Sequence, residues 1–256
     1  MKRFLLTLQL LTKIPVKYNA GFDEDFHKGI IYFPLVGFII GLIMYVVAIF
    51  MGRLFGFFLA SIFTVLVEVL LTGGLHLDGL GDTFDSIYSY RDRDKMLEIM
   101  KDSRLGTNAL LAVVFTVLIK IAFIFNIMNS DMMWIVMFMP IFSRLIVIWM
   151  TYKTESPRKE GMGNVFIGKT STESLLIAVL YTIPSTILIG MEFFVFEGSE
   201  IINLLFTTAV LFIFVDVFKH HIYSKIGGIT GDVLGCTIEL SELVYLFFIT
   251  AFGYIF

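Results

Sequence analysis

The chain has 256 residues, of which 57% are hydrophobic and 16% are charged, and its formal net charge is −3. A soluble domain of this size carries more charged residues, because polar groups have to cover its surface. The composition therefore excludes an ordinary soluble domain and predicts a single all-α domain over residues 1–256, a polytopic helical membrane protein. The charge gives no indication of a nucleic-acid partner, and none is expected.

The N-terminal segment begins with two basic residues, Lys2 and Arg3, and continues with a short apolar stretch. Lys13 and Pro15 follow at once, and no convincing cleavage site of small residues is present, which argues against a signal peptide. The apolar residues of this segment fall on one helical face: Phe4, Leu5, Leu8 and Leu11. We therefore predict a short amphipathic helix that lies at the membrane surface.

Apolar stretches long enough to cross a bilayer, which takes about 20 residues, follow along the chain. They cover residues 30–51, 54–71, 109–128, 132–152, 175–196 and 201–218, with a shorter stretch at 243–256. The last has only about 14 residues, so we expect a tilted or partly embedded helix there. The prediction is a bundle of about six to seven transmembrane helices.

Lysine and arginine are distributed unequally between the connections. The N-terminal segment and the predicted loops 72–108, 153–174 and 219–242 are basic, whereas the opposite side has Arg53 and an acidic loop at 197–200. Because basic loops stay in the cytoplasm, the side with the long loops is predicted to be cytoplasmic. The long polar motifs of the chain fall on this side, which predicts a polar active site facing the cytoplasm.

Acidic residues cluster between the second and third predicted spans. Asp78, Asp82 and Asp85 are spaced to share one face of a helix, where their charges would repel without a cation between them. Carboxylate oxygens are ligands that Mg²⁺ prefers, often together with substrate phosphates. Glu68, inside the second span, needs a partner. His76 is a metal ligand, a general base or a structural histidine, and a solvated acidic loop is the alternative for the whole segment.

Two cations and a hydroxyl precede the third span in the segment from Lys101 to Arg104. Lysine and arginine at such a position could clamp a phosphate. Their alternative role is to anchor the chain at the cytoplasmic surface, which requires no site.

A glycine-rich segment at residues 227–232 precedes the last span. The backbone N–H groups of Gly228, Thr230 and Gly231 could contact a phosphate, and Asp232 could bind a metal. The segment lacks the lysine and hydroxyl residue that end a P-loop, so it is no sign of an NTPase. A flexible turn between helices is the alternative.

Charged residues also lie within predicted spans. Arg144 is deep in the fourth span, where it needs a partner or a polar cavity, and Lys120 in the third raises the same question. Asp216 is a candidate partner for either. A further polar patch runs from Arg158 to Gly163.

Three longer motifs stand out in the chain: TGGLHLDGLGDTFD at 72–85, LEIMKDSRLG at 97–106 and GGITGDVLG at 227–235. In these motifs the chain resembles the cobalamin synthase family, the adenosylcobinamide-GDP ribazoletransferases. Residues 8–15, 33–37 and 143–144 also fit. Gly81 stands where the family has alanine and Phe84 where it has a small residue, but neither departure removes a carboxylate.

The resemblance implies that the 5′-hydroxyl of α-ribazole, or of its 5′-phosphate, attacks the phosphate attached to cobinamide in adenosylcobinamide-GDP and releases GMP. It implies Mg²⁺ as cofactor, membrane lipid as surroundings, and the inner or plasma membrane of a bacterial or archaeal cell. A homo-oligomer is left open.

The predicted roles of the residues follow from this reaction, which needs charge neutralisation and in-line positioning. Asp78, Asp82, Asp85 and Asp232 are expected to hold Mg²⁺, with Glu68 completing the shell. His76 or a carboxylate would take the hydroxyl proton. The expected phosphate contacts are Lys101, Arg104, Arg144, Gly228, Thr230 and Gly231.

Two alternative functions remain. A phosphotransferase of the CDP-alcohol type also uses clustered aspartates, but its motif order is absent. An ion-coupled transporter would use Glu68, Arg144 and Asp216 along a pathway.

Overall fold

The computed structural model describes residues 1–17, 23, 25–130 and 132–253, and within them it is helical with no named strand, as predicted. The helices are α1 Lys2–Leu11, η1 Phe26–Tyr32, α2 Phe33–Phe55, α3 Phe57–Thr72, α4 Leu75–Ile87, α5 Arg93–Ile99, α6 Thr107–Met128, α7 Trp134–Thr151, η2 Met162–Val165, α8 Thr172–Phe193, α9 Gly198–Ile226 and α10 Gly231–Gly253.

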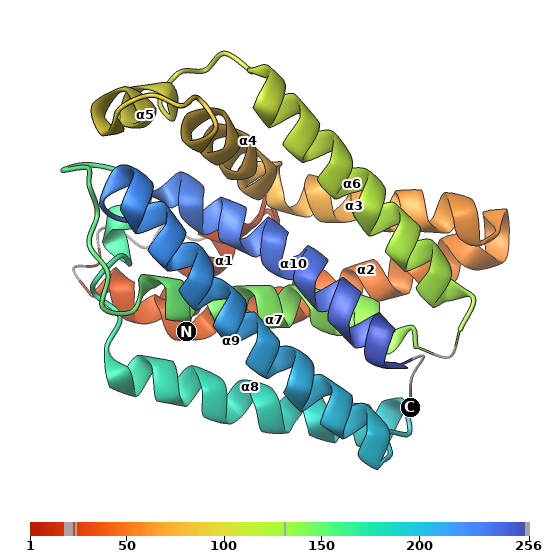
Figure 1. Ribbon diagram of the computed structural model, residues 1–256. Coiled ribbons are helices and arrows are strands. Elements are labelled where there is room, and N and C mark those ends of the chain that lie inside the picture. Colours follow the sequence, from red (N-terminus) through yellow and green to blue (C-terminus); the bar gives the residue numbers. More distant parts are fainter. Residues whose placement is uncertain (18–22, 24, 131, 254–256) are drawn as a thin grey trace.

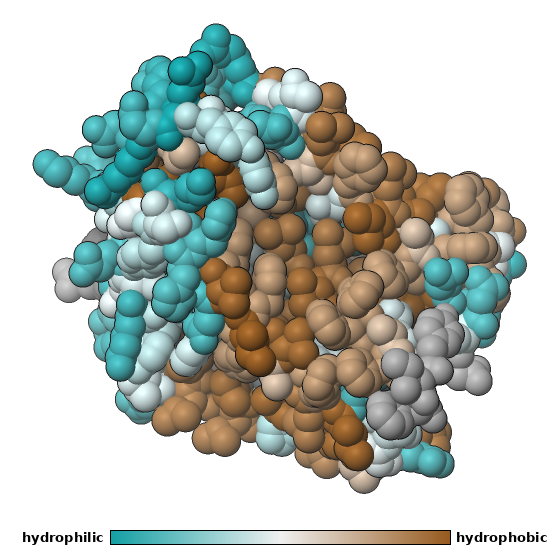
Figure 2. All heavy atoms as spheres, in the orientation of Figure 1, coloured by the Kyte–Doolittle hydropathy of each residue, from teal (hydrophilic) through white to brown (hydrophobic). Residues whose placement is uncertain are grey.

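The long helices lie side by side, and their ends gather at two opposite faces (Figure 1). Six helical stretches of the described chain are long and apolar enough to cross a membrane, and α3 with α4, bent by 89° where they meet, makes a seventh if it counts as one span. Hydrophobic side chains cover most of the visible face, and hydrophilic ones gather at the end that holds α5 (Figure 2). The protein is an integral membrane protein.

The C-terminal helix is longer than predicted. α10 begins at Gly231 and has 23 residues, so the short span expected at 243–256 is wrong, and the expected loop 219–242 shrinks to residues 227–230. Asp232, Glu239 and Glu242 lowered the apolar content of this segment, but all three lie within the helix. Residues 254–256 of the predicted span lie outside the described residues.

The N-terminal helix agrees with its prediction. In α1, Leu8 and Leu11 are buried, and the ring of Phe4 lies edge-on to Tyr32 at 5.8 Å. α1 packs on η1 and α2 at the polar end of the molecule, next to the cavity described below. Its place at a membrane surface stays a prediction.

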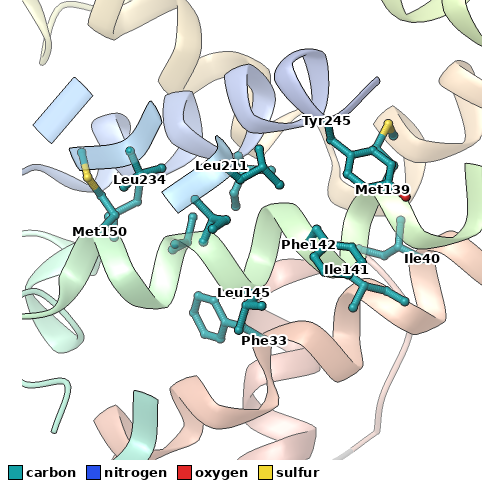
Figure 3. Packing of buried hydrophobic residues seen from close by; sticks show 14 of the residues in the cluster. Phe33, Ile40, Met139, Ile141, Phe142, Leu145, Met150, Leu211, Leu234 and Tyr245 are labelled. Carbon is teal, nitrogen blue, oxygen red and sulfur yellow. The ribbon is translucent and has the colours of Figure 1, made fainter. Parts of the chain in front are cut away.

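The central helix is α7, in which every residue except Trp149 is buried. α2 packs closely on it because Gly37 and Gly41 leave room for the backbone at Pro140 and Met137. On another side, the ring of Phe142 stacks on Tyr245 of α10, with centroids 5.6 Å apart. Figure 3 shows the apolar side chains of α2, α7 and α10 gathered between these helices.

Charged side chains meet in the middle of the bundle. Lys120 Nζ of α6 donates hydrogen bonds to Glu68 of α3 at 3.2 Å, to Glu239 of α10 at 2.8 Å, and to Glu242 of α10. Glu242 also accepts a hydrogen bond from Arg144 of α7. We call these five residues the buried ion cluster. Two cations are here paired with three carboxyl groups, and the partners expected for Glu68 and Arg144 are thus confirmed.

Asp216 is not the partner that the sequence analysis considered for Arg144 or Lys120. Its carboxylate accepts a hydrogen bond from Trp149 Nε1 at 2.8 Å. The two cations instead pair with Glu239 and Glu242, in the part of α10 that was expected to be a loop.

Replacing Gly41 with alanine tests the α2–α7 contact. The added Cβ would overlap the Met137 carbonyl, so we expect a loss of roughly 1–3 kcal/mol of stability, measured as a lower melting temperature of the purified protein in detergent. Gly52→Ala in the same helix is the control, because its Cβ would meet Phe57 at an ordinary 3.4 Å. Equal melting temperatures for both variants would contradict this packing.

Replacing Lys120 with methionine tests the buried ion cluster. Removing one partner leaves buried carboxylates uncompensated, which costs about 3–5 kcal/mol, so we expect little folded protein in size-exclusion chromatography. Adding Glu239→Gln removes one of these charges and should restore much of the yield. The control is Lys101→Met, at an exposed lysine. A Lys120→Met protein as abundant and as heat-stable as wild type would show that the cluster does not hold the bundle together.

Candidate functional site

The acidic segment predicted as a loop is mostly helix α4. α3 ends at Thr72, and Gly73 and Gly74 adopt left-handed φ angles of 64° and 74°, which residues with a side chain rarely take. The chain can therefore bend sharply and start α4 immediately. Asp78, Asp82 and Asp85 are consequently on one helix, as their spacing predicted.

Glycines bring α4 into contact with α10. A Cβ added at Gly79 would lie 2.6 Å from the carbonyl oxygen of Asp232, and one added at Gly235 would lie 3.3 Å from His76 Cα. Only glycine permits such an approach of two helices. The segments 72–85 and 227–235, far apart in the sequence, therefore form one site.

A cavity of about 180 Å³ opens beside this contact. Its charged and polar walls are His76 and Asp78 from α4, Asp232 from α10, and Arg158 from the connection between α7 and α8. The other walls are apolar side chains and glycines: Leu10, Leu11, Phe33, Leu75, Gly79, Val147, Gly161, Met162, Gly163, Phe166, Gly231, Leu234, Gly235 and Ile238. A concave, largely apolar pocket with a few convergent polar groups is typical of a ligand site.

Arg158 is the site residue that the sequence analysis noted only as part of a polar patch. Its Nη1 donates a hydrogen bond to Asp232 Oδ2 at 2.8 Å. Its Nε and Nη2 are buried and have no hydrogen-bond partner among the described residues. Gly163 fixes this connection against α10, since a Cβ there would lie 2.7 Å from Gly231 Cα. Arg158 therefore lines the cavity with two donors that have no partner among the described residues.

The expected carboxylates divide between two places. Asp78 and Asp232 line the cavity. Asp82 is half-buried and lies near enough to interact electrostatically with both carboxylates and with the Arg158 guanidinium. Asp85 instead accepts hydrogen bonds from the backbone N–H groups of Gly106 at 2.6 Å and Ala109 at 2.9 Å, and so caps the start of α6.

The carboxylates at the cavity suit a magnesium ion. Among the described residues no three histidine, cysteine, aspartate or glutamate side chains lie together as a ready-made metal site. Mg²⁺ commonly takes one or two carboxylates, with waters and substrate phosphates as its other ligands. Asp78 and Asp232 on the cavity wall, with Asp82 beside them, can supply such a partial set.

Two predicted site residues lie behind the cavity rather than on its wall. Glu68 is in the buried ion cluster, bonded to Lys120. Arg144 Nη2 lies 3.2 Å from His76 Nδ1, while its Nη1 contacts Glu242 and, at 2.9 Å, Ser143 Oγ. The structure therefore connects His76 through Arg144 to the cluster.

The basic segment before α6 does not line the cavity. Lys101 and Arg104 are exposed, and hydrogen bonds from Arg104 hold the pKa of Asp102 at about 2. The charge of Arg104 is therefore already matched by its neighbour Asp102, and the alternative role of surface anchoring stays a prediction.

Only part of the glycine-rich segment reaches the cavity. Gly231 lines it, whereas Gly228 packs against the backbone of Glu155 and the ring of Pro157. Thr230 is buried, and its Oγ1 accepts a hydrogen bond from Val233 N at 3.3 Å in the first turn of α10. The segment is a tight turn between two helices, whose role is to place Gly231 and Asp232.

Comparison with known proteins agrees with these motifs. The family model of cobalamin-5-phosphate synthase matches residues 3–250. A protein of Clostridioides difficile is 55% identical over 249 residues, which is 97% of either chain. One of Alkaliphilus metalliredigens is 43% identical over 97% of this chain and 95% of its own, and one of Clostridium tetani is 39% identical over 98% and 97%. All three are named adenosylcobinamide-GDP ribazoletransferase.

No solved structure matches the chain. The family match covers nearly the whole chain, including all the segments that build the cavity. The chain belongs to the cobalamin-5-phosphate synthase family.

Proposed function

We propose that this protein is an adenosylcobinamide-GDP ribazoletransferase that acts at the cavity between α4 and α10. The 5′-hydroxyl oxygen of α-ribazole, or of its 5′-phosphate, would form a bond to the phosphorus attached to cobinamide. The bond from that phosphorus to the oxygen of GMP would break, and the hydroxyl proton would leave to a base. The support is the full-length similarity to relatives of that name.

The observation that carries the proposal is the meeting of opposite charges on the cavity wall. Arg158, with two donors that have no partner among the described residues, faces the same cavity as Asp78 and Asp232. An arginine fork fits the oxygens of a diphosphate, and carboxylates suit a cation that accompanies it. Arg158 would bind and orient the diphosphate through Nε and Nη2.

Mg²⁺ held by one or two of the carboxylates Asp78, Asp82 and Asp232, together with waters and phosphate oxygens, would offset the negative charge that the diphosphate brings to the site. The apolar walls of the cavity would lower the local dielectric constant around a bound diphosphate and so strengthen its contacts with Arg158. Asp85 is not among the proposed metal ligands, because its carboxylate caps the start of α6.

The orientation in the membrane follows from charge. Lys2, Arg3 and the connections 88–106 and 152–171 lie at the cavity end of the helices, and the opposite connections carry little basic charge. We place the cavity on the cytoplasmic side, where GMP would be released.

The alternative from another class is an ion-coupled transporter, which predicts charges within several spans. Four helices do carry buried charges, but these pair with one another in the buried ion cluster. Release of GMP from adenosylcobinamide-GDP by protein in liposomes supports the enzyme. Uptake of substrate without turnover would support the transporter.

Replacing Asp82 with asparagine tests the metal role. Loss of a magnesium ligand removes several kcal/mol of charge stabilisation, so we expect GMP release to fall about 100-fold or more at saturating Mg²⁺. Asp94→Asn, at an exposed aspartate of α5, is the control. If Asp82→Asn keeps a rate within a few-fold of wild type, the metal role of Asp82 is wrong.

Replacing Arg158 with lysine tests the phosphate contact. The change keeps the charge but removes the fork, and hydrogen bonds to charged groups are worth about 1.5–3 kcal/mol, so kcat/KM for adenosylcobinamide-GDP should fall roughly 10- to 100-fold. KM for α-ribazole should change little. Arg91→Lys, at an exposed arginine, should behave as wild type. Full activity in Arg158→Lys would remove Arg158 from the site.

A further inference from the structure

His76 lies at the point where the cavity meets the buried ion cluster. It belongs to the first turn of α4, is 2% exposed, and lines the cavity. Its two ring nitrogens have different surroundings. Nδ1 lies 3.2 Å from Arg144 Nη2, and Nε2 is buried without a hydrogen-bond partner among the described residues.

The contact with Arg144 determines the form of the imidazole. A guanidinium has only donors and stays protonated, so Nδ1 has to accept the hydrogen bond and cannot itself carry a proton. The remaining proton of the neutral ring is then on Nε2. His76, a residue of the cavity wall, thus carries on Nε2 a proton that has no partner among the described residues.

The partners of Arg144 keep it from turning away. Its Nη1 is held by Glu242 and by Ser143 Oγ, and Glu242 is held in turn by Lys120. All of these side chains are nearly or fully buried. A rigid chain of contacts therefore fixes which nitrogen of His76 carries the proton, and Arg144 and Glu242 are positioning residues.

We propose that His76 donates a hydrogen bond from Nε2 to a phosphate oxygen of the bound substrate, and does not take the proton of the attacking hydroxyl. This inference rests on the proposed function and refines it. A base needs a free lone pair facing the substrate, and the only lone pair of this ring faces Arg144. The base is then a carboxylate of the cavity, which was the other candidate.

Two amide substitutions distinguish the role of Nε2 of His76 from the role of Nδ1. In glutamine the side-chain nitrogen occupies about the place of Nε2, so His76→Gln retains a donor toward the cavity. In asparagine the amide reaches only to about the place of Nδ1, so His76→Asn can satisfy Arg144 but offers nothing to the substrate. Neither variant can act as a base.

The experiment measures kcat for GMP release, with α-ribazole as acceptor so that no acceptor phosphate titrates. We expect His76→Gln to stay within about 10-fold of wild type and His76→Asn to fall roughly 100- to 1,000-fold, the usual effect of removing one such donor. Equal losses in both variants, or two fully active variants, would overturn the proposal. Wild-type protein that releases no GMP would instead contradict the proposed function.

Discussion

Charges cannot be buried in a bilayer unless they are paired, and this constraint organises the protein. Glu242 of α10 contacts both Lys120 of α6 and Arg144 of α7, while Glu68 ties α3 to the same cluster. Each helix is therefore fixed in rotation as well as in position, because a turned helix would leave a charge without its partner. Apolar packing alone specifies rotation less strictly within a membrane, where lipid is as apolar as the helix faces.

The cavity depends on this arrangement. With α10 fixed by Glu242, its first turn brings Gly231 and Asp232 to the polar end of the bundle, and Gly79 and Gly235 let α4 lie directly against it. The same cluster reaches the cavity through Arg144 and His76. Structural and chemical roles are therefore carried by one connected set of side chains, and a change in the cluster is expected to alter the site as well as the stability.

Hydropathy predicted the spanning helices well where a helix has a long apolar run. The prediction was wrong at α10, because the last span was taken to begin after Glu242, whereas Glu239 and Glu242 lie within the helix and are both paired inside the protein. Asp216 was therefore considered as the partner of Lys120 or Arg144. Their partners on α10, Glu239 and Glu242, lie in the predicted loop 219–242. Periodicity did place Asp78, Asp82 and Asp85 on one helix.

The family resemblance implied that residues 72–85 and 227–235 belong to one site, and the α4–α10 contact brings them together. The motifs could not predict which of their residues would face the cavity. Asp85 turns to the start of α6, and Arg104 pairs with Asp102. Arg158 reaches the site through the packing of Gly163 on Gly231, a contact between distant segments that leaves no local pattern in the sequence.

The central claim is that the cavity between α4 and α10 holds the diphosphate. A cryo-EM map of the wild-type protein with Mg²⁺ and adenosylcobinamide-GDP, without α-ribazole, tests it most directly. We predict density for the two phosphates within hydrogen-bond distance of Arg158, beside Asp78 and Asp232. Nucleotide density on the exposed surface around Lys101 and Arg104, with an empty cavity, would contradict the account.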